Sequence, residues 1–397
     1  MHSDAPIFNI LMYSHDTYGL GHIRRTMAIA SQIKNPQVNI LILTGSPIVG
    51  RFDFPEQIDF VRIPGMIKKS NDLYVPHSIK INPKHALEIR QNIIKATAKT
   101  FQPNLFIVDK VPLGLKREIM PTLKMLKRTQ ANCRTVLGLR DVMDDAASTI
   151  RDWRKKRIYD ALEKYYSEIW VYGEQCLYDP IVEYKIPESI SKKMFFTGYI
   201  PRISPNGRET RKEERVECNQ KLVLVTTGGG GDGFPLIDNY LRMLEINPPN
   251  NNLRSIIVSG PFMPKEERLL IAKRCKKLPV KYYHFNRRME RLIAAADLVV
   301  SMGGYNTVCE ILSHRKVGLI VPRETPRLEQ RIRAEFMKRH GLIDFIPWSE
   351  LSAQTLREKI DNLLSDLTPC QDAVKKFQLS GLDNIRQRIN CFQSEMI

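Results

Sequence analysis

Ser301-Met-Gly-Gly-Tyr-Asn-Thr-Val-Cys-Glu310 is the stretch that decides the fold, because it joins a strand to a helix through two glycines. The apolar run at 296–300 before it predicts a buried strand, and the residues after the glycines open a helix. Unpaired amides at a helix start attract anions, and Gly303 and Gly304 let the backbone approach phosphate oxygens closely. Glu310 lies about one turn into the helix, where its carboxylate can accept two hydroxyl hydrogen bonds. The stretch therefore predicts a site for a diphosphate that is attached to a ribose.

The pattern around this stretch predicts an α/β protein of two domains. Short apolar runs alternate with amphipathic stretches along the 397 residues, which is typical of parallel sheets covered by helices on both faces. Ligands of such sheets bind beyond the carboxyl ends of the strands, so the expected site is a cleft between the halves. The predicted segments are an N-terminal Rossmann-like domain at 1–200, a linker at 201–217, a C-terminal Rossmann-like domain at 218–372 and a tail with an amphipathic helix at 373–397.

Individual elements can be predicted from the same pattern. The predicted strands are 7–13, 38–43, 59–63, 105–108, 135–139, 168–171, 222–225, 255–258, 280–285, 298–300 and 318–321. The predicted helices are 23–33, 86–100, 115–129, 234–244, 265–275, 289–295, 306–312 and, in the tail, 373–392.

The composition indicates a globular protein without a membrane span. A hydrophobic content of 43% suits packed cores, and no run of about 18 apolar residues is present. The N-terminus lacks the basic and apolar regions of a signal peptide. The seven cysteines stand singly, which disfavours a disulfide framework or a zinc site. We therefore expect a cytoplasmic protein.

The formal net charge of +18 is spread over both halves of the chain. Such an excess suits nucleic acid or an anionic membrane as a partner. The sequence has no interleaved aromatics and no motif of the usual nucleic-acid-binding modules, so no nucleic acid is expected. The charge then belongs to a solvated surface, and peripheral contact with the anionic inner face of a membrane remains the alternative.

A second glycine loop, Tyr18-Gly-Leu-Gly-His-Ile-Arg-Arg25, follows the first predicted strand. It differs from a dinucleotide fingerprint because Arg24 takes the place of the third glycine, and the second strand ends without an acidic residue. These differences argue against a nicotinamide cofactor. Gly19 and Gly21 still bring backbone amides to a helix start. His22 stands at its mouth, where it either accepts a proton from an attacking hydroxyl or caps the turn.

Two further segments predict contacts with a phosphorylated ligand. Val225-Thr-Thr-Gly-Gly-Gly-Gly-Asp-Gly233 has four consecutive glycines after a strand, which favours an anion-binding loop over a plain turn. Arg323 can pair with phosphate through a fork of donors. Glu329-Gln330 supply acceptors and amide donors suited to sugar hydroxyls.

These segments carry a resemblance to a known family. Gly303-Gly304-x-Asn306-Thr307-x-x-Glu310, then Pro322-Arg323 and Glu329-Gln330-x-x-x-Ala334, resembles the nucleotide-sugar motif of GT-B glycosyltransferases and is most similar to the family 28 type. The resemblance implies two Rossmann-like domains that face a central cleft, with a C-terminal helix that crosses back to the N-terminal domain. It implies an inverting, metal-independent transfer of a hexose or N-acetylhexosamine, without a cofactor, from a nucleotide sugar, in first place a UDP-sugar.

The resemblance also assigns roles to residues. The N-terminal domain would bind the hydroxyl acceptor, which is a glycan, a lipid-linked sugar or a secondary metabolite. The donor-binding residues that it implies are Phe285 for the base, Glu310 for the ribose, Gly228, Gly229, Gly230, Gly303, Gly304, Asn306 and Thr307 for the diphosphate, Arg323 beside them, and Glu329 and Gln330 for the sugar.

The transfer needs a base that accepts the proton of the attacking hydroxyl. His22 is the first candidate, and Asp141, in the loop Leu139-Arg-Asp-Val142, is the second. Two other functions remain open on the same fold: a nucleotide-sugar epimerase or hydrolase, and a non-catalytic nucleotide-sugar-binding protein.

Overall fold

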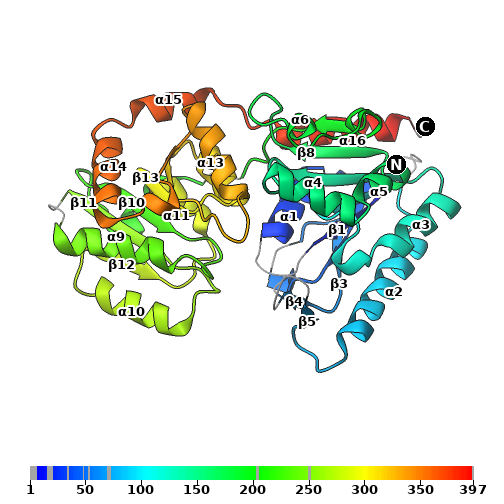
Figure 1. Cartoon of the computed structure of the whole chain (residues 1–397), viewed down its shortest axis with the longest axis horizontal. Coiled ribbons are helices and arrows are strands. Elements are labelled where there is room, and N and C mark those ends of the chain that lie inside the picture. The colour runs from blue at the N-terminus through cyan, green and yellow to red at the C-terminus, as the bar shows by residue number, and fades with distance from the viewer. Residues whose placement is uncertain are drawn as a thin grey trace. The chain divides into compact units, whose positions relative to one another are not determined.

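Figure 1 shows the computed structural model of the chain, which describes residues 7–15, 21–33, 35–47, 49–51, 54–68, 73–202, 205–248 and 252–395. The chain divides into two compact units: unit 1 is formed by Met1–Ile200 and Ser380–Ile397, and unit 2 by Pro201–Leu379. Each unit has its own parallel sheet and its own hydrophobic core. The expected α/β fold with two Rossmann-like sheets is confirmed.

The sheet of unit 1 is parallel, and the first strand of the sequence is third in its order. Among the described residues, its strands follow the order β3 (Ile58–Arg62), β2 (Val38–Thr44), β1 (Phe8–Ser14), β6 (Leu105–Asp109), β7 (Arg134–Arg140), β8 (Glu168–Tyr172) and β9 (Met194–Phe196). All residues of β6 and β8 are buried, as expected for strands covered on both faces. A short antiparallel hairpin of β4 (Met66–Lys68) and β5 (Tyr74–Pro76) stands apart from this sheet.

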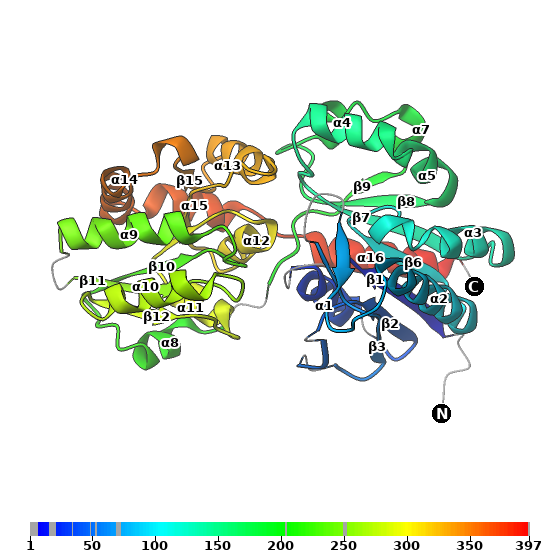
Figure 2. The same cartoon turned by 60° about the horizontal axis from the view of Figure 1, so that its bottom comes forward.

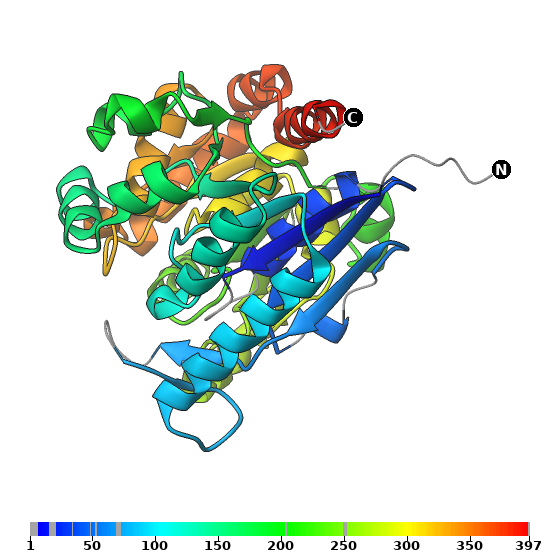
Figure 3. The same cartoon turned by 90° about the vertical axis from the view of Figure 1, so that its right-hand side faces the viewer.

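The helices of unit 1 cover both faces of its sheet. They are α1 (Gly21–Ile33), α2 (Pro83–Phe101), α3 (Met120–Thr129), α4 (Ala146–Lys155), α5 (Ile158–Tyr165), α6 (Pro180–Glu183), α7 (Glu188–Ser191) and α16 (Gly381–Ser394). The chain passes from β1 to β2 through α1 and from β3 to β6 through α2, in opposite directions along the sheet, so right-handed crossovers place these two helices on opposite faces. The helix α1 packs beside α16, and α2 packs beside α3 (Figure 2). Figure 3 shows α2, in cyan, lying along the sheet.

Unit 2 repeats the architecture with a smaller parallel sheet. Its described strands follow the order β12 (Val280–Tyr283), β11 (Leu253–Val258), β10 (Lys221–Thr226), β13 (Leu298–Ser301), β14 (Val317–Ile320) and β15 (Asp344–Phe345). Its helices are α8 (Gly207–Glu213), α9 (Phe234–Ile246), α10 (Lys265–Cys275), α11 (Met289–Ala295), α12 (Tyr305–Ser313), α13 (Glu329–Arg339), α14 (Ala353–Ser365) and α15 (Thr368–Lys376). The helix α9 packs against α10 and α14, whereas α11 packs against α8 and α12.

Three segments differ from the sequence-based expectation. The segment 201–217, expected to be a linker, contains α8, which is fastened to unit 2 because Arg211 binds Asp297 at 2.9 Å. The helix expected at 115–129 begins only at Met120, after a tight turn with positive φ at Lys116 and Arg117. That turn directs Glu118 into the core of unit 1, where it is fully buried.

The single helix expected at 373–392 is two helices. The helix α15 ends at Lys376 in unit 2, and α16 begins at Gly381 in unit 1. The break has a steric cause: the Gly381 amide donates to the Tyr199 carbonyl at 3.1 Å, and a Cβ on Gly381 would lie 2.5 Å from that oxygen. Within the described ranges, none of the helices is long and apolar enough to cross a membrane.

Candidate functional site

The glycine loop of unit 2, at 227–233, follows β10. It is packed against the loop at 259–262, which follows β11. Gly228 and Gly230 have φ of +65° and +90°, which favours glycine. A Cβ on Gly230 would lie 2.1 Å from the Ser259 carbonyl oxygen, so a side chain cannot fit there. The Gly229 carbonyl accepts the Phe262 amide at 2.9 Å. These contacts hold the loop at the carboxyl edge of the sheet, where ligands of α/β sheets bind.

The strand-to-helix turn after β13 lies beside this loop. Gly303 has φ of +74°, and Gly304 is the N-cap residue of α12. A Cβ on Gly228 would lie 3.9 Å from Thr307 Oγ1, so the glycine loop and the start of α12 adjoin. Asn306 accepts a hydrogen bond from Arg202 Nη2 at 3.0 Å. The structure thus brings together the glycines and helix start that the sequence assigns to a diphosphate.

Arg323 contacts the glycine loop of unit 2 and the first two residues of α13, at the carboxyl edge of the sheet. Its Nε lies 3.3 Å from Asp232 in the glycine loop, and its Nη2 lies 3.3 Å from Glu329 Oε1. Its backbone amide donates to Gln330 Oε1 at 3.1 Å. Glu329 and Gln330 begin α13 and are both buried. The guanidinium therefore stands between the glycine loop and the residues expected to contact the donor sugar.

The other two expected donor-binding residues lie on the same unit. Phe285 follows β12 and exposes 37% of its surface. Glu310 lies inside α12 and is half-buried. The structure shows where these residues lie, and their assignment to base and ribose stays a prediction.

His22 of unit 1 is held by a carboxylate that sequence reasoning missed. Its Nδ1 lies 2.5 Å from Asp109 Oδ2, at the carboxyl end of β6. Arg25 binds the other oxygen of Asp109 through Nη2 at 2.6 Å and Nε at 3.1 Å. The strand β6 lies beside β1, the strand that leads to His22, and this pairing brings two segments 87 residues apart into contact. Asp109 could have been indicated by its position, because it directly follows a predicted strand in the same unit as the glycine loop at 18–25.

Burial and charge set the protonation of this pair. Burial would raise the pKa of Asp109, but the charge of Arg25 and the contact with His22 outweigh it and hold that pKa below its ordinary value. Burial lowers the pKa of His22, and Asp109 opposes this lowering only in part. His22 is therefore neutral at pH 7, and its Nδ1 donates its proton to Asp109, which leaves the lone pair on Nε2.

A second histidine extends this cluster into the core. The ring of His15 lies 5.8 Å from that of His22, nearly perpendicular to it. Its Nδ1 lies 3.2 Å from the Tyr13 hydroxyl, which donates to Glu118 at 2.5 Å. Arg90 binds both oxygens of Glu118, at 2.5 and 2.6 Å. Burial and the neighbouring His22 lower the pKa of His15 well below its ordinary value, so a second neutral imidazole stands beside the first.

Asp141 is placed differently from His22. It is 1% exposed, and its Oδ2 accepts the Tyr199 hydroxyl at 3.0 Å. Its Oδ1 accepts the Val142 amide at 2.7 Å. Both oxygens therefore serve the internal structure of the loop after β7.

The remaining residues of the first glycine loop are only partly described. Gly21 begins α1, and Arg24 is half-buried on that helix. Gly19 lies outside the described residues. Asp145, near the second candidate base, caps α4 by accepting the Ser148 amide at 2.9 Å. Among the residues that the structure describes, no three His, Cys, Asp or Glu side chains are grouped so that they could hold a metal ion.

Comparison with known proteins finds relatives of this chain, most clearly of its C-terminal half. Residues 223–389 match the glycosyltransferase family 28 C-terminal domain. A UDP-N-acetylglucosamine--N-acetylmuramyl-(pentapeptide) pyrophosphoryl-undecaprenol N-acetylglucosamine transferase of Streptococcus thermophilus is 36% identical over 164 residues. That match spans 41% of this chain and 43% of the relative, which is less than half of its length. The enzyme of the same name from Alkaliphilus oremlandii is 23% identical over 390 residues, 95% of both chains.

A solved structure shows the same fold over nearly the whole chain. The crystal structure of MurG from Acinetobacter baumannii has a TM-score of 0.62 and 14% sequence identity, with 97% of this chain and 100% of that chain covered. Three findings point to the same class of protein, the glycosyltransferases: the fold of the two units, the match to the family 28 domain and the names of the relatives. The chain carries a match to the glycosyltransferase family 28 C-terminal domain at 223–389, and it is similar in fold to a GT-B glycosyltransferase over nearly its whole length.

Proposed function

We propose that this protein transfers a hexose or N-acetylhexosamine from a UDP-sugar to a hydroxyl acceptor, with inversion at the anomeric carbon. The pairing of His22 with Asp109 at 2.5 Å, at the carboxyl edge of the sheet of unit 1, is the observation that carries the proposal. A sugar-nucleotide sensor needs a donor site but has no use for a neutral histidine held by a buried carboxylate. Relatives named as N-acetylglucosamine transferases support the substrate class, including a lipid-linked sugar as the acceptor.

His22 acts as the general base in this proposal. The attacking hydroxyl donates its proton to Nε2 as its oxygen forms a bond to the anomeric carbon. Asp109 then stabilises the imidazolium that forms, because its carboxylate remains ionised at the Nδ1 side. The geometry favours His22 over Asp141, whose two oxygens already accept hydrogen bonds inside their loop.

The donor half of the proposal rests on unit 2. The bond from the anomeric carbon to the diphosphate oxygen breaks, and UDP leaves with increased negative charge. The amides at the start of α12, the loop at Gly228–Gly230 and the Arg323 guanidinium would stabilise that charge electrostatically. We propose that these groups do so without a metal ion. Activity that survives exhaustive chelation by EDTA is the expected result, and loss of activity that Mg²⁺ restores would contradict it.

A donor screen followed by turnover tests the function. UDP-, GDP- and dTDP-sugars are compared by thermal shift, and the donor that raises the unfolding temperature identifies the nucleotide. That donor is then incubated alone and with glycan, lipid-linked and small-molecule acceptors, and released UDP is measured. Product that forms only with an acceptor supports transfer, whereas consumption of the donor alone indicates an epimerase or hydrolase. His22→Ala should lower acceptor-dependent turnover about 100-fold or more, and unchanged turnover would exclude it as the base.

A further inference from the structure

Arg333 is a buried arginine beside the donor site that sequence reasoning did not assign. It lies on α13, three residues after Gln330, and is 1% exposed. Its Nη1 donates to the Gly303 carbonyl at 3.2 Å. Its guanidinium carbon lies 5.7 Å from the centre of the Tyr305 ring, which is also buried. The guanidinium therefore contacts the residues on both sides of Gly304.

The bond to the Gly303 carbonyl fixes the direction of the next amide. The carbonyl of Gly303 and the N–H of Gly304 belong to one planar trans peptide, so they point in opposite directions. With the carbonyl turned to Arg333, the Gly304 N–H points away from α13. This N–H is among the first amides of α12, which have no acceptor within the helix and are available to an anion.

The surroundings of Gly304 show that space lies beside this peptide. A Cβ built on Gly304 meets no atom of the described residues within 4 Å. A Cβ on Gly303 would lie 2.5 Å from Ile320 Cγ2, so the peptide is packed on one side and open on the other. The buried Arg333 guanidinium lies at the carbonyl end of this peptide, and so on the side away from the Gly304 N–H.

We propose that Arg333 is a positioning residue of the donor site. Through its bond to the Gly303 carbonyl it holds the Gly303–Gly304 peptide with its N–H toward the diphosphate, without touching the ligand. The inference rests on the proposed use of a UDP-sugar. It predicts that the affinity for the diphosphate of the donor depends on Arg333, whereas the affinity for its base and ribose does not.

The test compares the binding of UDP and of uridine to the full-length protein by calorimetry. Both ligands carry the same base and ribose, so the ratio of their dissociation constants measures the contribution of the diphosphate. Arg333→Met should weaken the binding of UDP about tenfold or more and leave that of uridine unchanged. Arg333→Lys keeps the charge but not the guanidinium geometry, so its ratio should lie between those of Arg333→Met and the wild type. Unfolding temperatures of all variants are recorded beside the binding data.

Arg331→Met and Arg331→Lys are the matched controls. Arg331 lies on the same helix and binds Glu335 and Glu324 instead, so both ratios should equal that of the wild type. Equal loss of UDP and uridine binding in the Arg333 variants would reduce Arg333 to a structural role and overturn the inference, as would an unchanged ratio. If Arg333→Met does not fold, the ratio for Arg333→Lys decides. A wild-type protein that binds UDP no better than uridine would instead contradict the proposed donor.

Discussion

Gly303 and Gly304 are neighbours in the chain, but they are glycines for different physical reasons. Gly303 needs φ of +74° and has Ile320 against its missing side chain. Gly304 has φ of −58° and ψ of 147°, which any residue adopts, and its missing side chain faces open space. The fold therefore requires the first glycine, whereas no contact with the described residues requires the second, which fits the proposed approach of a ligand.

This contrast predicts the behaviour of Gly304→Ala. The variant should fold with an unfolding temperature equal to or slightly above that of the wild type, because alanine restricts the unfolded chain. Its affinity for UDP should fall about tenfold or more, because the methyl group occupies the space beside the amide. Calorimetry with UDP and a thermal melt measure both effects. Gly303→Ala is the comparison and should lower the unfolding temperature. An unchanged affinity in Gly304→Ala would show that no phosphate approaches this residue.

A second prediction at the residue scale concerns Asp109. Asp109→Asn removes the negative charge that raises the pKa of His22, so that pKa should fall further below its ordinary value. Because His22 is a base only while neutral, the acidic limb of the pH–rate profile should move to lower pH. Turnover should also fall about 100-fold or more, because an amide stabilises the imidazolium less than a carboxylate does. Histidine NMR titration measures the pKa directly, without an acceptor.

An exposed aspartate supplies the control for this experiment. Asp160 lies on α5, is paired with Arg157, and is 57% exposed. Asp160→Asn should leave the titration of His22 unchanged. A His22 pKa that is the same in Asp109→Asn and the wild type would remove Asp109 from the catalytic pair.

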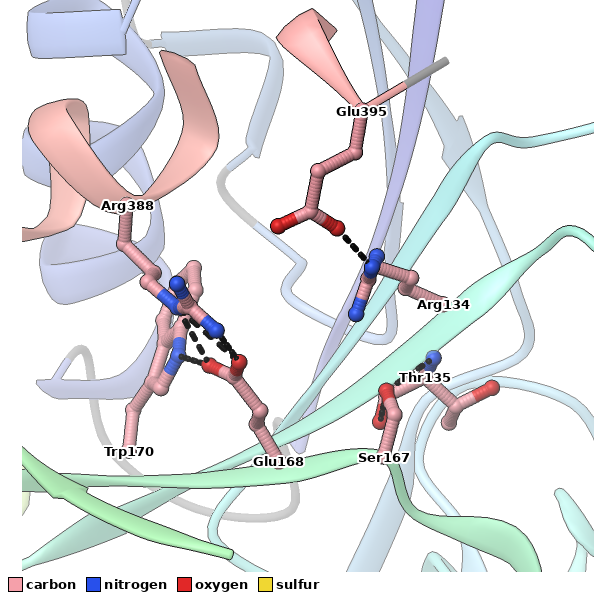
Figure 4. Close-up of polar contacts among 7 residues, drawn as sticks. All are labelled: Arg134, Thr135, Ser167, Glu168, Trp170, Arg388 and Glu395. Carbon is pink, nitrogen blue, oxygen red and sulfur yellow. Dashed lines mark hydrogen bonds and ion pairs between the residues drawn. The ribbon is translucent and has the colours of Figure 1, made fainter. Parts of the chain in front are cut away.

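At the scale of elements, the C-terminal helix is fastened to unit 1 by ion pairs and aromatic packing. Arg388 on α16 binds Glu168 on β8, with Nε at 2.9 and 3.1 Å from the two carboxylate oxygens. Trp170 donates to the same carboxylate at 2.9 Å (Figure 4). Arg134 binds Glu395 farther along the helix (Figure 4). Glu168 is buried, so these contacts satisfy a carboxylate that would otherwise be costly.

Arg388→Met tests this fastening. The change leaves a buried carboxylate without its cation and should lower the free energy of unfolding of unit 1 by about 1–2 kcal/mol, at the lower end because Arg388 is partly exposed. Arg386→Met on the same helix is the control, because Arg386 is 49% exposed and pairs only across one turn with Asp383. Its effect should lie within about 0.5 kcal/mol of zero. If chemical denaturation shows the same change in the free energy of unfolding for both variants, the Glu168–Arg388 ion pair does not stabilise unit 1.

At the scale of the whole molecule, the chain forms two separate cores, and one of the two units is built from two segments that are far apart in the sequence. Residues 201–379 complete unit 2, and Ser380–Ile397 then contributes to unit 1. Three large apolar side chains of α16 are buried: Ile385, Ile389 and Phe392. The last residues of the sequence therefore stabilise the unit that the first residues form.

Truncation after Leu379 should lower the stability of unit 1 and leave the stability of unit 2 unchanged. The loss of the three buried side chains costs about 1.5–3 kcal/mol each, so the unfolding transition of unit 1 should fall to a lower temperature. The transition of unit 2 and the dissociation constant of UDP should not change, because the expected donor residues all lie in residues 201–379. Calorimetric melts with and without UDP distinguish the two transitions. Loss of UDP binding in the truncated protein would contradict this division.

The sequence by itself determined the elements and the class of ligand, because both depend on local patterns. The apolar runs predicted the strands, and α10 and α11 begin and end at the predicted residues. The glycines predicted tight turns, and Gly228, Gly230 and Gly303 have positive φ, which is a property of single positions. That these turns bind an anion stays a prediction.

Only the tertiary structure decided which distant residues act together. The contact of His22 with Asp109 exists because β6 pairs with β1, and an acidic residue at the end of a strand indicates a candidate without revealing that pairing. Arg333 could not be assigned because its contact with Gly303 depends on where the fold places α13 relative to the turn after β13. The break before Gly381 arises from a carbonyl 182 residues earlier, at Tyr199. Local periodicity carries no information about such contacts, which are set by the order of strands in a sheet and by the packing of helices upon it.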